Sequence, residues 1–167
     1  MAVFTMSVSA LDFSEADTNR LYERVIRQIQ PLEVISPDKK HTAVYWQTHP
    51  GIYGKNCSHI IIRDKTGKIM AEHNLRDHGG RLVAVAHWSP DSRFCIFTTI
   101  SAGGHSPWQF EPYIYSAADK RFRFLGDSLD AVINPEFRFE PPSTVLFATR
   151  QGNISLKSSS LISTNVP

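Results

Sequence analysis

The residues best suited to chemistry in this sequence lie in a glycine-rich, histidine-bearing stretch at positions 101–110. It contains Gly103, Gly104, His105 and Trp108. Paired glycines permit backbone conformations closed to other residues, and a tryptophan offers the large, rigid contact area common at binding hot spots. The pattern is typical of a binding loop. It also fits a plainer interpretation, in which Trp108 packs over the end of a sheet and the glycines only shape the loop.

Histidine spacing argues against a metal centre or a catalytic triad. The seven histidines show neither an HxH nor an HExxH arrangement, and no cysteine pair has zinc-site spacing. Ser101 or Ser106 could be grouped with His105 or His78 and with Asp77 as a nucleophile set, but the Gly-x-Ser-x-Gly motif is absent. We therefore expect no catalytic residue, no metal site and no cofactor. A small metal- or His-dependent hydrolase remains an open alternative.

Composition describes an ordinary folded domain. The 167 residues are 41% hydrophobic and 20% charged, with a net charge of +2. Such a balance predicts no nucleic-acid partner, and no apolar run approaches the ~20 residues of a membrane span. The start lacks a basic region before its apolar residues, so we expect a cytoplasmic protein, or a periplasmic one if a signal peptide was removed. Cys57 and Cys95 are expected to be free thiols.

One convincing helix is predicted over residues 14–30. Ser14 can cap its start, with Asp17 three residues later as a capping-box partner. Apolar residues then recur at helical spacing until Pro31 stops the helix. We expect its apolar stripe to cover a face or edge of a sheet, and a membrane-anchoring role is the less favoured alternative.

From residue 31 onward the sequence repeats itself. Ser36-Pro37-Asp38 is followed by an apolar run at 42–46, and 53 residues later Ser89-Pro90-Asp91 is followed by a second run at 94–98. The same offset relates residues 60–69 to residues 113–122, and a fading third copy begins at Phe137. Periods of this length are typical of propellers and arrays. Each repeat contains four short apolar segments separated by turns, which predicts a four-strand antiparallel meander.

These motifs resemble the Tol-type, WD-like β-propeller repeat over about residues 31–150. The same repeat occurs in propeller domains beside peptidases of the prolyl oligopeptidase type. The resemblance implies an all-β fold of propeller blades, but it implies little about function, because propellers host many unrelated roles. A closed propeller typically has about 4–8 blades, and the sequence holds two and part of a third.

We therefore expect an incomplete all-β propeller with one N-terminal helix. The expected segments are a helical segment covering the sheet (1–30), repeats at 31–76, 82–126 and 131–150, and a Ser-rich tail (151–167). Mid-strand positions predict a buried core that consists of Val44, Ile61, Val85, Ile96, Phe97, Ile114 and Phe147.

Meander geometry gathers the longer connections at one end of the sheets, within residues 47–58, 74–81, 100–111 and 126–130. We expect ligand or partner binding at this long-loop end, through Gly103, Gly104, His105, Trp108, His49, Tyr53 and His78. The favoured function is a non-catalytic protein-interaction or ligand-binding module. A propeller-type accessory domain of a larger hydrolase or peptidase is the alternative. Open sheet edges predict a protein partner or self-association.

Overall fold

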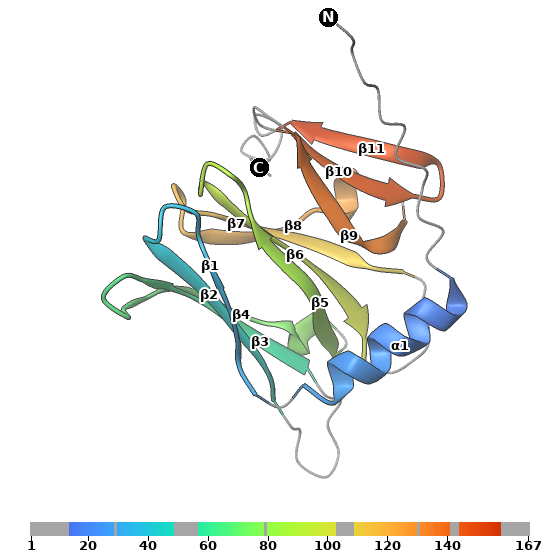
Figure 1. Ribbon diagram of the computed structural model, residues 1–167, viewed down its shortest axis with the longest axis horizontal. Coiled ribbons are helices and arrows are strands. Elements are labelled where there is room, and N and C mark those ends of the chain that lie inside the picture. Colours follow the sequence, from blue (N-terminus) through green and yellow to red (C-terminus); the bar gives the residue numbers. More distant parts are fainter. Residues whose placement is uncertain are drawn as a thin grey trace, which may run out of the picture.

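The structure is a computed structural model that describes residues 14–28, 30–48, 57–78, 80–102, 109–129, 131–140 and 144–157, with Asp77 and His78 described by their backbone only. Within these ranges the chain forms one α-helix and three antiparallel sheets, which follow one another in space as they do in sequence (Figure 1). The predicted all-β, propeller-like fold is confirmed, and the sheets do not close into a ring.

The first and second sheets are four-strand meanders. The first contains β1 (Leu32–Ile35), β2 (His41–Thr48), β3 (Cys57–Asp64) and β4 (Ile69–Asn74), and the short 3-10 helix η1 (Leu75–His78) follows it. The second contains β5 (Arg81–Trp88), β6 (Phe94–Ser101), β7 (Glu111–Ser116) and β8 (Arg121–Phe124), followed by η2 (Gly126–Ser128). Neighbouring strands in the sequence are neighbours in each sheet. β6 lies 53 residues after β2 at both ends, so the predicted repeat is confirmed at the level of strands.

The two Ser-Pro-Asp turns have the same hydrogen bonds. Ser36 N donates to the His41 carbonyl at 2.9 Å, and Ser89 N donates to the Phe94 carbonyl at 2.8 Å. In each turn the serine hydroxyl donates to the aspartate carboxylate, at 2.7 Å in both cases, and accepts the backbone N–H that opens the next strand. These bonds satisfy backbone groups as the chain reverses, which explains why the motif recurs at the first hairpin of both sheets.

The third sheet has three strands, β9 (Val132–Glu140), β10 (Thr144–Thr149) and β11 (Gly152–Lys157), in the order β11-β10-β9. β11 comes from the segment expected to be a Ser-rich tail. It pairs with β10 from Gly152 to Lys157. A left-handed φ of 116° at Gly152 helps to form the tight connection between the two strands.

The sheets stack face to face, and the core lies between them. All seven core residues expected from the sequence are buried, from Val85 at 7% exposed to Phe147 at 0%. Buried hydrogen bonds also join the sheets: Trp88 Nε1 donates to the Val34 carbonyl at 2.9 Å, and Thr98 Oγ1 donates to the Pro135 carbonyl at 2.7 Å. Cys57 and Cys95 are buried free thiols, as expected.

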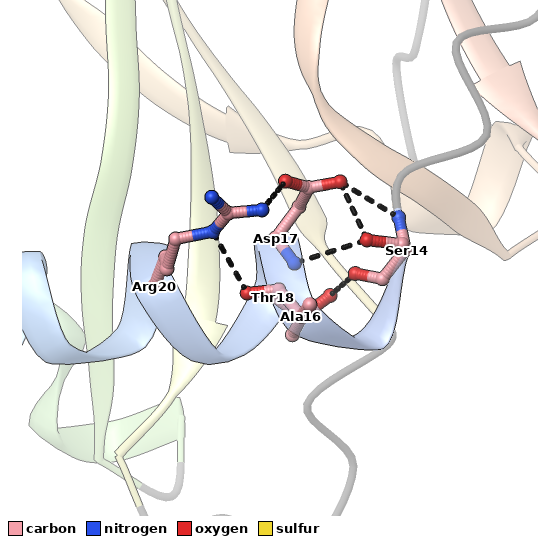
Figure 2. Close-up of polar contacts among 5 residues, drawn as sticks. All are labelled: Ser14, Ala16, Asp17, Thr18 and Arg20. Atoms are coloured by element: carbon pink, nitrogen blue, oxygen red, sulfur yellow. Dashed lines mark hydrogen bonds and ion pairs between the residues drawn. The ribbon is translucent and has the colours of Figure 1, made fainter.

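The predicted capping box is present at the start of α1 (Glu15–Ile26). Asp17 N donates to Ser14 Oγ at 3.2 Å, and Ser14 N donates to the Asp17 carboxylate at 3.2 Å (Figure 2). The helix ends at Ile26, earlier than the expected residue 30. A proline disfavours helical backbone at the residue before it. The chain must therefore leave the helical conformation before Pro31 to enter β1.

The apolar face of α1 packs against β5. Leu21 and Val25 are buried in the same cluster as Leu82 and Val85 of that strand, and the Tyr22 hydroxyl donates to the Ala102 carbonyl at 3.0 Å. No helix in the described part of the chain is long and apolar enough to span a membrane.

Candidate binding site

Most residues predicted to bind a ligand lie outside the part of the chain that the structure describes. His49, Tyr53, Gly103, Gly104, His105 and Trp108 fall outside the described residues. The backbone of His78 is described as the last residue of η1, and its side chain is not. Their role in binding stays a prediction.

The order of strands gives the expected arrangement of connections. In the first sheet the β1–β2 and β3–β4 turns lie at one end, so the β2–β3 connection and the link to β5 leave from the other. The second sheet repeats this arrangement. The strand ends that flank the long connections therefore lie at one end of the stack.

A cavity of about 320 Å³ lies between α1 and the first strands of the sheets, and we call it the inner-edge pocket. Its walls come from α1, from β1, β2 and β3 of the first sheet, from β5 and from β9. Its lining includes Arg24, Gln47, Ser58, Ala86, His87 and Glu136. Because α1 packs against β5, the helix forms one side of this pocket.

Gln47 is the most unusual residue of the pocket. Its side chain is buried, with 6% of the residue exposed, yet neither Oε1 nor Nε2 has a hydrogen-bond partner among the residues that the structure describes. A buried amide without partners costs about 1–3 kcal/mol, so such groups are uncommon in folded proteins and call for an explanation. Gln47 lines the pocket, so a rotation of its side chain toward the cavity would let a polar ligand supply the missing partners.

Pairing between β2 and β3 shows where the Gln47 side chain lies. Gln47 is directly opposite Ser58, and side chains at opposed positions share a face of the sheet. The Ser58 hydroxyl accepts the Val83 N–H at 2.9 Å, which ties this face to β5. Gln47 therefore lies on the side of the first sheet that faces β5.

The pocket contains charges of both signs. His87 Nε2 lies 3.8 Å from a Glu136 carboxylate oxygen. The neighbouring His87 imidazole lowers the pKa of Glu136, and the positive charge of Arg24 acts in the same direction. Glu136 is therefore ionised at neutral pH, opposite the cationic Arg24. Burial raises the pKa of Tyr45, another wall residue, which keeps its hydroxyl protonated as a hydrogen-bond donor.

Sequence reasoning placed Gln47 and Ser58 in a long loop, whereas the structure places them in β2 and β3. A signal was available in the alternation of β2. Ala43, Tyr45 and Gln47 occupy every second position, so an apolar face ends in a polar residue that must be buried. Nothing in the local sequence shows that α1 and Glu136 meet at the same place.

Metal-binding side chains do not cluster in the part of the chain described here. Within the described residues, no group of three or more His, Cys, Asp or Glu side chains could hold a metal ion. The nucleophile set considered from the sequence includes His105, Ser106 and the side chains of Asp77 and His78, which lie outside the described residues, so that set remains untested.

No protein-family model and no curated protein sequence matches this chain. Among solved structures it is similar to one from a structural and mechanistic analysis of two prolyl endopeptidases, with a TM-score of 0.52 and 12% sequence identity. The match covers 81% of this chain and 20% of that one. At this identity the similarity shows the fold alone. It supports a propeller-like arrangement of the sheets, because prolyl endopeptidases have a β-propeller domain.

Proposed function

We propose that this protein is a non-catalytic binding module of propeller type, with Tol-type repeats, that holds a small polar ligand or a segment of a partner protein. The observation that carries the proposal is the unpartnered amide of Gln47 in the inner-edge pocket. The pocket is close to the long-loop end, since β2 ends one residue after Gln47 and the connection containing His49 and Tyr53 begins there. The two regions would then form one binding surface.

Nuclear magnetic resonance tests this function directly on the 18.8 kDa chain. A panel of small polar molecules (amides, carboxylates, ammonium compounds and sugars) is titrated into ¹⁵N-labelled protein. We expect shifts of the backbone signals of residues 83–87 and of the Gln47 side chain, while the turn at residues 36–40 stays unchanged. A panel that shifts no pocket signal would contradict the proposal.

A second candidate function is a propeller-type accessory domain of a larger hydrolase or peptidase. The similarity to a prolyl endopeptidase structure favours it, because this chain corresponds to 20% of that protein's length. Mapping the full-length transcript separates the two candidates. A reading frame that continues into a hydrolase domain supports the accessory role, and a reading frame without one supports the independent module.

A further inference from the structure

The strand that lines the inner-edge pocket has an unpaired edge. β5 is the first strand of its sheet, and no other strand among the described residues pairs with its outer side. Residues 83–87 of this edge all line the pocket. An unpaired strand edge presents a row of N–H and C=O groups that can bind an extended chain.

The ladder between β5 and β6 indicates which backbone groups face outward. Ser89 N donates to the Phe94 carbonyl, and the pairs His87–Ile96 and Val85–Thr98 follow at steps of two residues. Hydrogen-bonded and non-hydrogen-bonded pairs alternate in an antiparallel ladder. Ala86 therefore occupies a non-hydrogen-bonded position, and its N–H and C=O point away from β6. The Val83 N–H, which donates to Ser58 Oγ, points outward in the same way.

Gln47 adds a second pair of groups with the same chemistry. Its Oε1 accepts and its Nε2 donates, as a backbone carbonyl and N–H do, and neither has a partner within the described ranges. Ala86 and Gln47 each offer one donor and one acceptor, and such a pair is complementary to a peptide group, which also has one of each. The charges of Arg24 and Glu136 oppose each other, so the pocket does not select a ligand by net charge.

We propose that the ligand of the inner-edge pocket is a short extended peptide segment. It adds to the open edge at Ala86, and one of its peptide groups bonds to the side-chain amide of Gln47 when that side chain turns toward the cavity. The cavity of about 320 Å³ is at the lower end of the range for ligand sites, so it holds a short segment rather than a long one. The inference rests on the proposed binding function and specifies its ligand class. Strand addition is an established mode of peptide recognition.

Two matched probes test the ligand class. The first is N-acetyl-dialanine methylamide, and the second is its depsipeptide, in which an ester oxygen replaces the central N–H. Both are titrated at millimolar concentration into ¹⁵N-labelled wild-type protein, Gln47→Met and Gln151→Met. Gln151 lies exposed in the turn between β10 and β11 and serves as the control position.

We expect the amide probe to shift the Ala86 backbone signal and the Gln47 side-chain signal. Loss of one hydrogen-bonded amide should weaken binding about tenfold or more, both for the depsipeptide and for Gln47→Met, while Gln151→Met binds as the wild type does. Equal binding of the two probes, or unchanged binding by Gln47→Met, overturns the peptide assignment. If another molecule of the polar panel shifts the pocket signals and the amide probe does not, the peptide assignment fails and the binding function stands. If no molecule shifts them, both fail.

Discussion

Two serine hydroxyls, one in each Ser-Pro-Asp turn, make the same hydrogen bonds. Each donates to an aspartate and accepts the N–H of the residue that opens the following strand. Ser36 is 1% exposed and Ser89 is 5% exposed, so removal of either hydroxyl leaves a strand N–H without a partner in a place that water cannot easily reach. The turns also contact each other, because Asp38 N donates to Ser92 Oγ at 3.0 Å.

Substitution of either turn serine by alanine should therefore destabilise the fold. We expect Ser36→Ala and Ser89→Ala each to lower the free energy of unfolding by about 1–3 kcal/mol, the cost of an unsatisfied buried group. Urea unfolding measures the effect. Ser155→Ala, at an exposed position of β11, is the control and should change it by less than about 0.5 kcal/mol. Two turn variants as stable as the control would show that these bonds contribute nothing.

The aspartates in the turns make the stability of the fold depend on pH. The hydrogen bond from Ser36 lowers the pKa of Asp38 below 3.8, and the hydrogen bond from Thr66 does the same for Asp64. A carboxylate with a lowered folded-state pKa stabilises the protein above its unfolded-state pKa, and this contribution is lost as the pH falls through the folded-state value.

We therefore expect the urea midpoint to fall as the pH is lowered from about 5 to about 3, the range around the unfolded-state pKa of an aspartate. Asp64→Asn keeps an acceptor oxygen for the Thr66 and Lys68 N–H groups but cannot titrate. Its midpoint should fall less than that of the wild type over the same range. A parallel fall in both proteins would contradict the assignment of this titration to Asp64.

At the scale of elements, the second sheet is the centre of the molecule. Its β6 is buried along its length except at Ser101. The Phe97 ring stacks on Tyr113, with centroids 5.2 Å apart, and packs with Ile60 of the first sheet. Phe97 therefore joins two strands of its own sheet to the neighbouring sheet.

Truncation of this ring should be among the most damaging changes in the protein. We expect Phe97→Ala to lower the free energy of unfolding by about 3–5 kcal/mol, because a large cavity would remain between two sheets. Ile69→Ala removes an apolar side chain that is 51% exposed, and its expected cost is below about 0.5 kcal/mol. Chemical denaturation compares the two. Similar costs would mean that the Phe97 ring does not fill the space between the two sheets.

The elements were largely predictable because their signals are local. Ser14 and Asp17 form the capping box that their spacing predicts, and the 53-residue offset between Ser36 and Ser89 predicts equivalent turns. The candidate site was much harder to predict from the sequence. Gln47 and Glu136 lie 89 positions apart in the sequence, and they line one pocket only because the sheets stack and α1 packs on β5. No local sequence pattern predicts that these two residues line the same pocket.

At the scale of the whole molecule, apolar side chains remain exposed at sheet edges. The large hydrophobic residues that are exposed within the described part of the chain are Leu32 and Ile35 of β1, Ile69 of β4 and Phe124 of β8. All lie on edge strands. Unpaired edges of this kind can pair with another chain, and we propose self-association or a protein partner through them.

Light scattering tests self-association. We expect a mass above the 18.8 kDa of one chain at micromolar concentration, decreasing on dilution. Ile35→Lys places a charge on the β1 edge, a device that natural edge strands use against pairing, and should lower the mass. A constant mass of 18.8 kDa over the whole concentration range would contradict self-association and leave a different protein as the edge partner.

The central claim is that the pocket amide of Gln47 is kept for a ligand at a cost to stability. Urea unfolding of wild-type protein and Gln47→Met, each with and without N-acetyl-dialanine methylamide, tests it most directly. Without the probe, the variant should be more stable by about 1 kcal/mol, because methionine replaces a buried amide that has no partner. The probe should stabilise the wild type, since it binds the folded state, and should have little effect on the variant. A variant that is less stable than the wild type and equally stabilised by the probe would contradict the claim.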